Sequence, residues 1–597
     1  MIEYRIRPAQ PLAHLFEVTC RIAQPNSDGQ VLALPAWIPG SYLVRDFARN
    51  IVSIRAQDDD GPVAIIKLDK QTWRAEPAKG TLEVVYEIYA YDESVRTAYL
   101  NESRGFFNGT SVFLRVAGQE QAACLVAIEA PQGDAFSEWH VATTLPATQV
   151  DARGFGRYRA ENYADLIDYP VEMGEFDRVE FEVGGVPHSM ALCGEHNTDT
   201  GRLASDLQKI CEAQQTMFGG TPLQRYLFLT LVKTQGYGGL EHRDSSALIC
   251  SRKDLPPTGL GKATPEYHRF LGLCSHEYFH LWNVKRIRPP AVAASDLAAE
   301  APFRDLWAYE GITSYYDELM LLRAGVIEPQ AFLDELAVTL TRVWRTPGRF
   351  RQSLAESSFD AWTKFYKQDE NAPNAIISYY AKGAVVALCL DLQLRLDSAG
   401  KVSLDDVMRT LWRRHGSRDE PVPEHGIEAI VNELAGCPCL DFFSRYVHGT
   451  EDPPVAELLA AFGIDANLRA RTGLMDAGGP GGGAAASSNA DLGVVTAQEQ
   501  GREIIKMVLN GRAAEAAGLQ PGDELVAINR QRLVPGGLDG FLNSARAGEN
   551  WQLQVFRDDR LLEKVLTLGE KPLDTWELIL GAKAGDELQA RRQAWWS

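Results

Sequence analysis

The sequence predicts a multidomain protein with a β-rich N-terminal domain, a central α+β domain that continues into a helical lobe, and a small C-terminal domain of strands. Three patterns support this prediction. Apolar and polar residues alternate with period two up to about residue 190, helical spacing dominates residues 264 to 465, and strand patterns resume after a Gly/Ala/Ser-rich segment at 476–490. A chain of 597 residues can form about four domains of ordinary size.

Composition and charge narrow the possible partners. Apolar residues make up 45% and charged residues 23%, as in ordinary globular proteins. The 60 Lys and Arg residues against 80 Asp and Glu residues give a net charge of −20, which repels the phosphates of nucleic acids. The N-terminus lacks the apolar stretch of a signal peptide, and no window approaches the ~18 apolar residues of a membrane span. We therefore expect neither nucleic-acid nor membrane partners.

The cysteines indicate a reducing compartment. Nine cysteines are scattered singly between Cys20 and Cys439, and the one close pair is Cys437 with Cys439. An odd number without a repeated spacing is typical of reduced, mostly buried thiols. We expect the chain to be cytoplasmic.

The N-terminal domain is predicted from its strands. TLEVVYEIYAYD (81–92) and RVEFEVGG (178–185) alternate apolar and polar residues, the pattern of half-buried antiparallel strands. Turns that contain Pro and Gly, such as WIPGSY (37–42), separate them. We place this domain at 1–190.

The central domain, predicted at 191–400, mixes helices and strands. LASDLQKICEAQQTMFGG (203–220) has helical spacing and a Gly stop, and RYLFLTLV (225–232) follows as a strand. A helical lobe is predicted at 401–475, where KVSLDDVMRTLWRRHG opens on Ser403 as an expected N-cap.

The C-terminal part contains a linker, a module and a tail. Residues 476–490 carry one charge among Gly, Ala and Ser and cannot build a core, so we predict a flexible linker. Strands and tight turns then predict a separate module at 491–572. We expect the last residues, 573–597, to form a helical tail whose tryptophans dock on the rest of the chain.

The strongest chemical signal is His276-Glu277-Tyr278-Phe279-His280. On a helix, positions i and i+4 lie on one face, so both imidazoles can bind one Zn²⁺ at ~2.0–2.1 Å. Glu277 projects about a quarter-turn away and is placed to take a proton from a zinc-bound water. We therefore predict His276 and His280 as metal ligands and Glu277 as the catalytic base. A chance match on a surface helix is the alternative.

Two histidines leave tetrahedral zinc short of a protein ligand, and two downstream glutamates are candidates. Glu300 lies in AASDLAAEAP, which has no aromatic neighbours, whereas Glu310 lies in DLWAYEGITSYYDEL, where Trp307 and Tyr315 are available to pack against it. A metal ligand must be held rigidly by packing. We expect Glu310 to be the third ligand, with Glu300 as the alternative.

HEYFH (276–280) followed by WAYEGITSYY (307–316) resembles the gluzincin metallopeptidases, relatives of aminopeptidase N with a His₂Glu zinc site. With HLWNVKRIRP (280–289) and WIPGSYLVRDFARN (37–50), the chain resembles the glycyl aminopeptidase family, whose members carry a C-terminal PDZ domain. The resemblance covers nearly the whole chain. It implies a thermolysin-like catalytic domain, one Zn²⁺ per chain and peptide substrates with a free N-terminus.

Gly238-Gly239-Leu240-Glu241-His242 resembles the G-x-M-E-N element of the same relatives, in which the Glu binds the free α-amine of the substrate. The resemblance implies that Gly239 and Glu241 bind substrate. A fixed carboxylate suits this task because it forms charge-assisted hydrogen bonds to an ammonium. A turn with an exposed Glu is the alternative. His242 replaces the Asn of the relatives, so no role is assigned to it.

Tyr379-Tyr380-Ala381-Lys382-Gly383 resembles the Y-x-K-G element, in which the Tyr hydroxyl stabilises the oxyanion. The resemblance implies that Tyr380 is catalytic and Tyr379 its packed neighbour. The alternative is an aromatic pair in a helix core.

The C-terminal module resembles a PDZ domain. LGVV (492–495) fits the carboxylate-binding turn and its strand, and the AAEAAGLQPGDELVAINR segment (513–530), in which Arg530 stands where Gly is common, is the most family-specific part. The resemblance implies a peptide or chain-terminus ligand added as a strand. A module that only docks on the catalytic body is an equal alternative.

The combined prediction is a zinc aminopeptidase that prefers small N-terminal residues such as Gly or Ala, a preference that the resemblance implies. The alternatives are a catalytically silent PDZ adaptor and a zinc endopeptidase. Glu241 separates the aminopeptidase from the endopeptidase, because a carboxylate in the cleft favours a free amine over an internal amide. The remaining histidines, among them His14, His140, His268 and His448, show no paired spacing and are expected to be surface or hydrogen-bonded residues.

Overall fold

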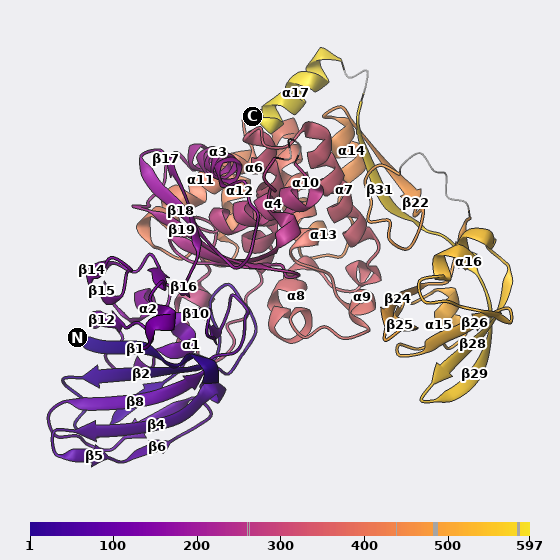
Figure 1. The fold of residues 1–597 in the computed structure, drawn as a ribbon. Helices are drawn as coiled ribbons and strands as arrows, with labels where there is room; N and C mark the ends of the chain where they lie inside the picture. The colour runs from indigo at the N-terminus through magenta and orange to yellow at the C-terminus, as the bar shows by residue number, and fades with distance from the viewer. Residues whose placement is uncertain (260, 262, 437–438, 482–487, 582–584) are drawn as a thin grey trace. The chain divides into compact units, whose positions relative to one another are not determined.

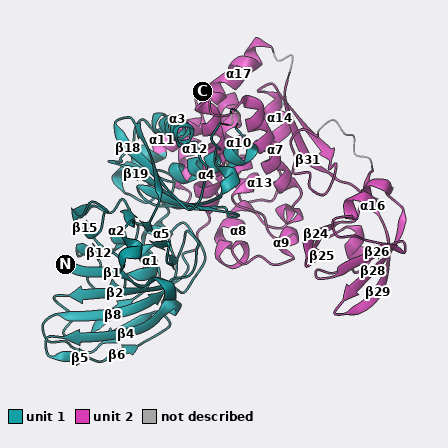
Figure 2. Cartoon of the chain, viewed as in Figure 1, with its two compact units in different colours: residues 1–301, 411–423 teal, residues 302–410, 424–597 magenta. Residues whose placement is uncertain are grey.

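The computed structural model describes residues 1–259, 261, 263–436, 439–481, 488–581 and 585–597, so the predicted linker and tail each include positions outside the described part. The chain divides into two compact units (Figure 2), residues 1–301 with 411–423 and residues 302–410 with 424–597. Of the helices in the described residues, none combines the length and the apolar character that crossing a bilayer requires. The described cysteines are free thiols, and all but Cys439 are buried.

Unit 1 begins with an eight-stranded sheet (Figure 1). In order across the sheet, its strands are β14 (Ala147–Val150), β15 (Gly156–Ala160), β12 (Cys124–Ile128), β1 (Ile2–Gln10), β2 (Leu15–Ile22), β8 (Leu82–Tyr89), β4 (Ile51–Asp58) and β5 (Gly61–Val63). The alternation along β1 buries Ile2, Tyr4 and Ile6 on one face. β1 pairs antiparallel with β2 and parallel with β12.

Smaller elements complete this part of unit 1. One four-stranded sheet contains β13 (His140–Ala142), β16 (Val171–Gly174), β10 (Arg104–Phe107) and β9 (Ala98–Leu100), and another contains β11 (Arg115–Val116), β3 (Gln30–Ala33), β7 (Thr72–Ala75) and β6 (Ile65–Lys67). Short helices are α1 (Gly109–Val112), α2 (Tyr163–Leu166) and α5 (Pro290–Ala293).

A second large sheet of unit 1 has the order β17 (Asp177–Val183), β18 (Val186–Cys193), β19 (Tyr226–Lys233), β21 (Ser245–Ser251) and β20 (Gly238–Glu241). The strand predicted at 178–185 therefore pairs through β18 with this sheet and not with the N-terminal sheets. The change of sheet lies between Gly174 and Asp177, earlier than the boundary predicted at 190. Period two identifies a strand but carries no information about its partner.

Two helices of unit 1 pack together and fix the HEYFH segment. α3 (Thr200–Phe218) ends at Gly219 in the left-handed conformation, and α4 (Pro265–Phe279) begins after Thr264, whose hydroxyl accepts the Tyr267 amide. The Gln215 amide donates to the Tyr278 hydroxyl at 2.8 Å, and Gln214 donates to Ser275. These buried contacts set the rotation of α4, and with it the face that carries its histidines.

Unit 2 consists mainly of helices (Figure 1). They are α6 (Ile312–Arg323), α7 (Pro329–Trp344), α8 (Leu354–Phe359), α9 (Ala372–Ala375), α10 (Ala381–Asp397), α11 (Leu404–Arg414), of which residues 404–410 belong to this unit, α12 (Gly426–Ala435), α13 (Leu440–Tyr446), α14 (Val455–Ala460) and α17 (Asp586–Trp596). Before α6, residues Trp307–Gly311 form one turn of π-helix. Short π-helical turns inside helices are frequent at functional sites.

The π-helical turn and the start of α10 approach each other at two glycines. A Cβ on Gly311 would lie 2.5 Å from the Gly383 Cα, and a Cβ on Gly383 would lie 2.8 Å from the Gly311 Cα. Only hydrogen fits on both sides. The glycines of WAYEG and YYAKG therefore bring Glu310 and Tyr380 into neighbouring positions of unit 2.

The predicted helical tail is partly a strand. β31 (Leu573–Leu580) pairs antiparallel with β22 (Ile464–Ala470), because LDTWELIL alternates and buries Trp576 and Leu578. α17 follows and buries Trp595, whose indole N–H donates to the Tyr315 hydroxyl at 2.7 Å. The expectation of docking tryptophans holds for these two described residues.

The C-terminal β-rich region has its own apolar core, which includes Leu525, Trp551 and Leu553. Its main sheet has the order β24 (Val494–Glu499), β25 (Arg502–Val508), β26 (Glu524–Ile528), β28 (Asn550–Arg557) and β29 (Arg560–Thr567), with β27 (Gln531–Arg532) beside β26. β23 (Ala490–Asp491), β30 (Gly569–Glu570), α15 (Ala513–Ala516) and α16 (Leu538–Ser544) complete the region.

We predict that Gly383→Ala lowers the free energy of unfolding by about 1–3 kcal/mol, the usual effect of overpacking a close contact. Gly540→Ala is the matched control, since Gly540 is also helical and a Cβ there meets no atom within 4 Å. Alanine favours helix over glycine, so the control keeps or gains stability. Denaturant unfolding of the three proteins measures the difference, and equal stability of Gly383→Ala and wild type would contradict the packing argument.

Candidate active site

The imidazole rings of His276 and His280 bring their Nε2 atoms close together. Their Nε2 atoms lie 3.1 Å apart, with the rings nearly perpendicular at 89°. The His280 Nδ1 lies 2.7 Å from the Asn283 carbonyl oxygen, which can only accept, so Nδ1 carries the proton and Nε2 offers a lone pair. Two nitrogens bound to one tetrahedral zinc at ~2.0–2.1 Å would be separated by about 3.3 Å. The pair therefore fits a shared metal ion.

The loop after α4 orients His280 and contains a residue with a strained backbone. Val284 has a φ of 122°, a conformation that is unfavourable for a β-branched residue. Such outliers cost about 1–3 kcal/mol and persist where the surroundings hold them. On one side of Val284, Asn283 directs its carbonyl to His280, and on the other Lys285 reaches Asp168 at 2.7 Å. The strained residue thus separates two positioning contacts.

Glu277 and Glu241 gather beside His280. One ligand atom from each of these three residues lies within 4.8 Å of the others. Glu277 is 5% exposed on α4, and Glu241 is 4% exposed at the end of β20. Two carboxylates this close repel each other when both are ionised, so the arrangement favours a bound cation such as an ammonium or a metal.

Two glycines make room for these carboxylates. A Cβ on Gly239 would lie 1.9 Å from the Glu277 Oε1, and a Cβ on Gly40 would lie 2.4 Å from both oxygens of Glu241. Gly40 also has a φ of 93°, which favours glycine. The Arg96 guanidinium donates to the Gly239 carbonyl at 2.9 Å and fixes the strand. The turn predicted at 37–42 therefore packs against the Glu241 carboxylate.

His242 has a structural partner. Its Nδ1 lies 3.1 Å from the Asp168 carboxylate, which the Lys285 ammonium also contacts. Burial alone would raise the pKa of Asp168, but the Lys285 charge and the His242 hydrogen bond hold that pKa well below its usual value. His242 thereby ties the end of β20 to the segment after α2 and positions Glu241.

Glu310 lies in unit 2 on the π-helical turn, and its side chain is 1% exposed. Glu300, the alternative ligand, is exposed and lies outside helices and strands. A rigid, buried carboxylate is the better metal ligand because packing fixes its oxygens. The local structure of each residue therefore favours Glu310.

Tyr380 directly precedes α10 and is half-buried, whereas Tyr379 is fully buried. The Tyr379 ring packs against Phe365 at a centroid distance of 4.7 Å and against Tyr380 at 4.6 Å. Burial of the Tyr380 hydroxyl, followed by the Glu310 charge, raises the pKa of Tyr380 well above its usual value. The hydroxyl stays protonated at neutral pH and can donate a hydrogen bond to an anion.

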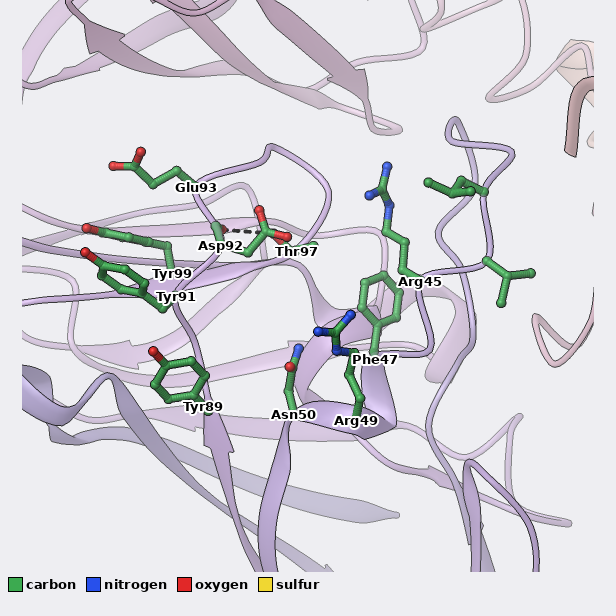
Figure 3. Close-up of a pocket in the computed structure, with 12 residues that line it drawn as sticks. Arg45, Phe47, Arg49, Asn50, Tyr89, Tyr91, Asp92, Glu93, Thr97 and Tyr99 are labelled. Atoms are coloured by element: carbon green, nitrogen blue, oxygen red, sulfur yellow. Dashed lines mark hydrogen bonds between the residues drawn. The ribbon is translucent and has the colours of Figure 1, made fainter. Parts of the chain in front are cut away.

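A separate open cavity of about 690 Å³ lies in unit 1 (Figure 3). Tyr91 stacks on Tyr99 at 5.3 Å and forms one wall with Tyr89. Arg45 and Arg49 also line the cavity. Its lining residues include none of the predicted catalytic or metal-binding residues.

Comparisons with known proteins identify the family of this chain. Residues 3–175 match the family model "Peptidase M61 N-terminal domain", and residues 269–386 match "M61 glycyl aminopeptidase". The crystal structure of an aminopeptidase N family protein from Idiomarina loihiensis is 38% identical, covers 100% of both chains and has a TM-score of 0.95. The chain belongs to the M61 glycyl aminopeptidase family. It is a metallo-aminopeptidase.

More remote structures were also found. An M1 zinc metallopeptidase from Deinococcus radiodurans is 13% identical over 76% of this chain and 94% of its own, with a TM-score of 0.48. Yeast LTA4 hydrolase is 12% identical over 77% of this chain and 70% of its own, with a TM-score of 0.48. Among curated proteins, none matches the chain.

Sequence reasoning missed the residues that position this M61 site. Asp168, Asn283 and Lys285 act through His242, His280 and the backbone, and none of them belongs to the His-x-x-x-His spacing that predicts the metal ligands. Asn283 and Lys285 lie in HLWNVKRIRP, a segment that the sequence analysis uses for the family resemblance alone. Gly40 belongs to WIPGSY, where a glycine in a short turn predicts a special backbone conformation but not a contact with Glu241.

We predict that Gly40→Ala raises the KM of the M61 enzyme for a free-amine peptide by about tenfold or more, equivalent to about 1.4 kcal/mol, because the new methyl displaces the Glu241 carboxylate. Gly118→Ala is the control, since Gly118 also has a positive φ, 81°, but a Cβ there meets no atom within 4 Å. Steady-state kinetics separate the two. If both variants keep the wild-type KM, Gly40 does not shape the site.

Proposed function

We propose that this enzyme removes single N-terminal residues from peptides with a free α-amine, using one zinc ion held by His276, His280 and Glu310. The two imidazoles lie on α4 of unit 1, and Glu310 supplies a buried carboxylate in unit 2. The observation that carries the proposal is the position of the Glu241 carboxylate, within 4.8 Å of Glu277 and His280.

The donor set supports zinc. Two imidazoles and one carboxylate form a common catalytic zinc site, with the fourth position left for water or substrate. The 3.1 Å separation of the two Nε2 atoms and the fixed tautomer of His280 fit this geometry. A zinc ion bound there would polarise the substrate carbonyl and lower the pKa of a water toward ~7.

Glu277 is proposed as the catalytic base. Its carboxylate accepts a proton from the attacking water and delivers it to the departing amine, so that one group serves as base and then as acid. Gly239 leaves its oxygens unobstructed, since any Cβ there would overlap Glu277. Burial limits the competition of bulk water for this carboxylate.

Glu241 is proposed to bind the substrate ammonium. Within one residue, the α-amine nitrogen and the carbonyl carbon are separated only by Cα, at bond lengths of about 1.5 Å each. A carboxylate that holds the ammonium beside Glu277 therefore brings the first peptide bond, and no later one, to the base. Gly40 packs against the Glu241 carboxylate, where a Cβ would lie 2.4 Å from both oxygens, so the backbone leaves little room for a preceding residue. This closure disfavours the endopeptidase alternative.

Tyr380 is proposed to donate its hydroxyl proton in a hydrogen bond to the oxyanion. Its raised pKa keeps the phenol protonated, so that the hydroxyl can act as a hydrogen-bond donor. One such hydrogen bond contributes roughly 3 kcal/mol to transition-state stabilisation. The preference for glycine and other small residues is supported by the family description.

The C-terminal region is proposed to be a PDZ module. β24 lies at the end of the sheet order, and its Val495 is 43% exposed, so it offers an edge to which an extended peptide could add. Two hydrogen bonds, from Asn374 to the Val508 carbonyl and from the Asn510 amide to Asn374, support docking of the same region on the rest of unit 2. The two roles are compatible, because Val508 and Asn510 lie outside β24.

We predict that Glu310→Gln weakens zinc retention by more than about 10-fold, since a neutral amide replaces an anionic ligand. Metal content after dialysis against a chelator measures the effect. Glu300→Gln, a change at an exposed position, should retain wild-type zinc. Loss of zinc from Glu300→Gln with full retention by Glu310→Gln would reverse the ligand assignment.

We predict that Glu241→Gln lowers kcat/KM for a free Gly- or Ala-peptide by about 10- to 100-fold, the equivalent of 1.5–3 kcal/mol for a hydrogen bond to a charged group. For the acetylated peptide, which we expect to be a poor substrate of the wild type, kcat/KM should change little because this peptide carries no ammonium. Glu300→Gln serves as the control. Equal cleavage of free and acetylated peptides by the wild type would overturn the aminopeptidase mechanism and favour the endopeptidase.

A further inference from the structure

Three side chains of types that commonly bind metal ions lie close together on the surface of unit 2, and none of them belongs to the proposed zinc site. They are His425, Glu428 and His448, from the N-terminal end of α12 and the segment after α13 (Figure 1). Their ligand atoms all lie within 4.8 Å of one another. In sequence, His448 is 20 residues from Glu428, so no local spacing reveals the group.

Both imidazoles face one carboxylate oxygen. The His448 Nε2 lies 2.8 Å from the Glu428 Oε1, and the His425 Nδ1 lies 3.6 Å from the same atom. The rings are 5.9 Å apart and inclined at 58°. Glu428 is mostly covered, with a side-chain exposure of 16%, whereas both histidines can be reached by solvent. A cation can therefore enter between side chains whose positions are already restricted.

The surroundings are acidic. The His425 backbone N–H donates to the Asp305 carboxylate, which brings a second carboxylate into the neighbourhood of Glu428. Glu424 adds a further negative charge near Asp305. With neutral imidazoles the group carries a net negative charge, which favours a divalent cation.

The backbone of His425 is also unusual. Its φ of 61° lies in the left-handed region, which non-glycine residues rarely adopt. Strained residues persist where the surroundings hold them and cluster at functional positions. Here the conformation directs the amide to Asp305 while the imidazole faces Glu428.

We propose that His425, Glu428 and His448 form a second site for a divalent transition-metal ion such as Zn²⁺. His425 binds through Nδ1, His448 through Nε2 and Glu428 through a carboxylate oxygen, and water completes the coordination. Two imidazoles and a carboxylate match the preference of zinc for nitrogen and oxygen donors. The ion would link the start of α12 to the end of the α13 segment.

The test counts zinc in the full-length enzyme after equilibrium dialysis in a zinc-buffered solution. Wild type should hold one more zinc ion per chain than His448→Gln and His425→Asn, whose affinity at this site should fall more than about 100-fold. Asparagine tolerates the left-handed conformation, so His425→Asn removes the imidazole without new strain. His140→Gln, a change at another exposed histidine, should behave as wild type.

The comparison is a difference between variants, so it does not depend on how fully the proposed catalytic site is occupied. Equal zinc content in wild type, His448→Gln and His425→Asn would overturn the proposal, as would an equal loss in His140→Gln. A second measurement needs no substitution. Zinc should protect His425 and His448 of the wild type from diethyl pyrocarbonate, measured by peptide mass spectrometry, while His140 continues to react. Unchanged modification of His425 and His448 would contradict the site.

Discussion

The site depends on the convergence of two imidazole Nε2 atoms at 3.1 Å. Two lone pairs cannot face each other at this distance without a cation or proton between them. The protein imposes the arrangement through the helical repeat of α4 and through one hydrogen bond from His280 to the Asn283 carbonyl. The strain at Val284, the contacts of α3 with α4 and the ion pair of Lys285 with Asp168 all serve to hold this geometry.

Close backbone approach is the second constraint. Gly40 and Gly239 leave space beside Glu241 and Glu277, so that two carboxylates can lie near one imidazole. In unit 2, Gly311 and Gly383 allow a π-helical turn to contact a helix start. In each case the position requires glycine because a Cβ would overlap the Glu241 or Glu277 carboxylate, or the backbone of the facing glycine.

Some local features could be predicted from the sequence. HEYFH predicts that His276 and His280 share one face, because the α-helical repeat brings positions i and i+4 together, and their Nε2 atoms lie 3.1 Å apart in the structure. The roles of these residues and of Glu277 stay predictions. Aromatic neighbours favoured Glu310 over Glu300, in agreement with their burial in the structure. Glu241 and Tyr380 were predicted from the family resemblance alone, because no spacing in the sequence points to them, and their roles stay predictions.

Other features were decided by tertiary structure alone. The alternating pattern at 178–185 predicts a strand but does not show which sheet the strand joins. The sequence predicts a helix for residues 573–580, whereas the structure has a strand there because it pairs with β22. His448 had no paired spacing, yet the fold brings it to Glu428. The physical reason is common to these cases. Periodicity records which face of an element is apolar, a property of neighbouring residues, whereas the pairing of distant segments depends on the path of the whole chain and leaves no repeat in the sequence.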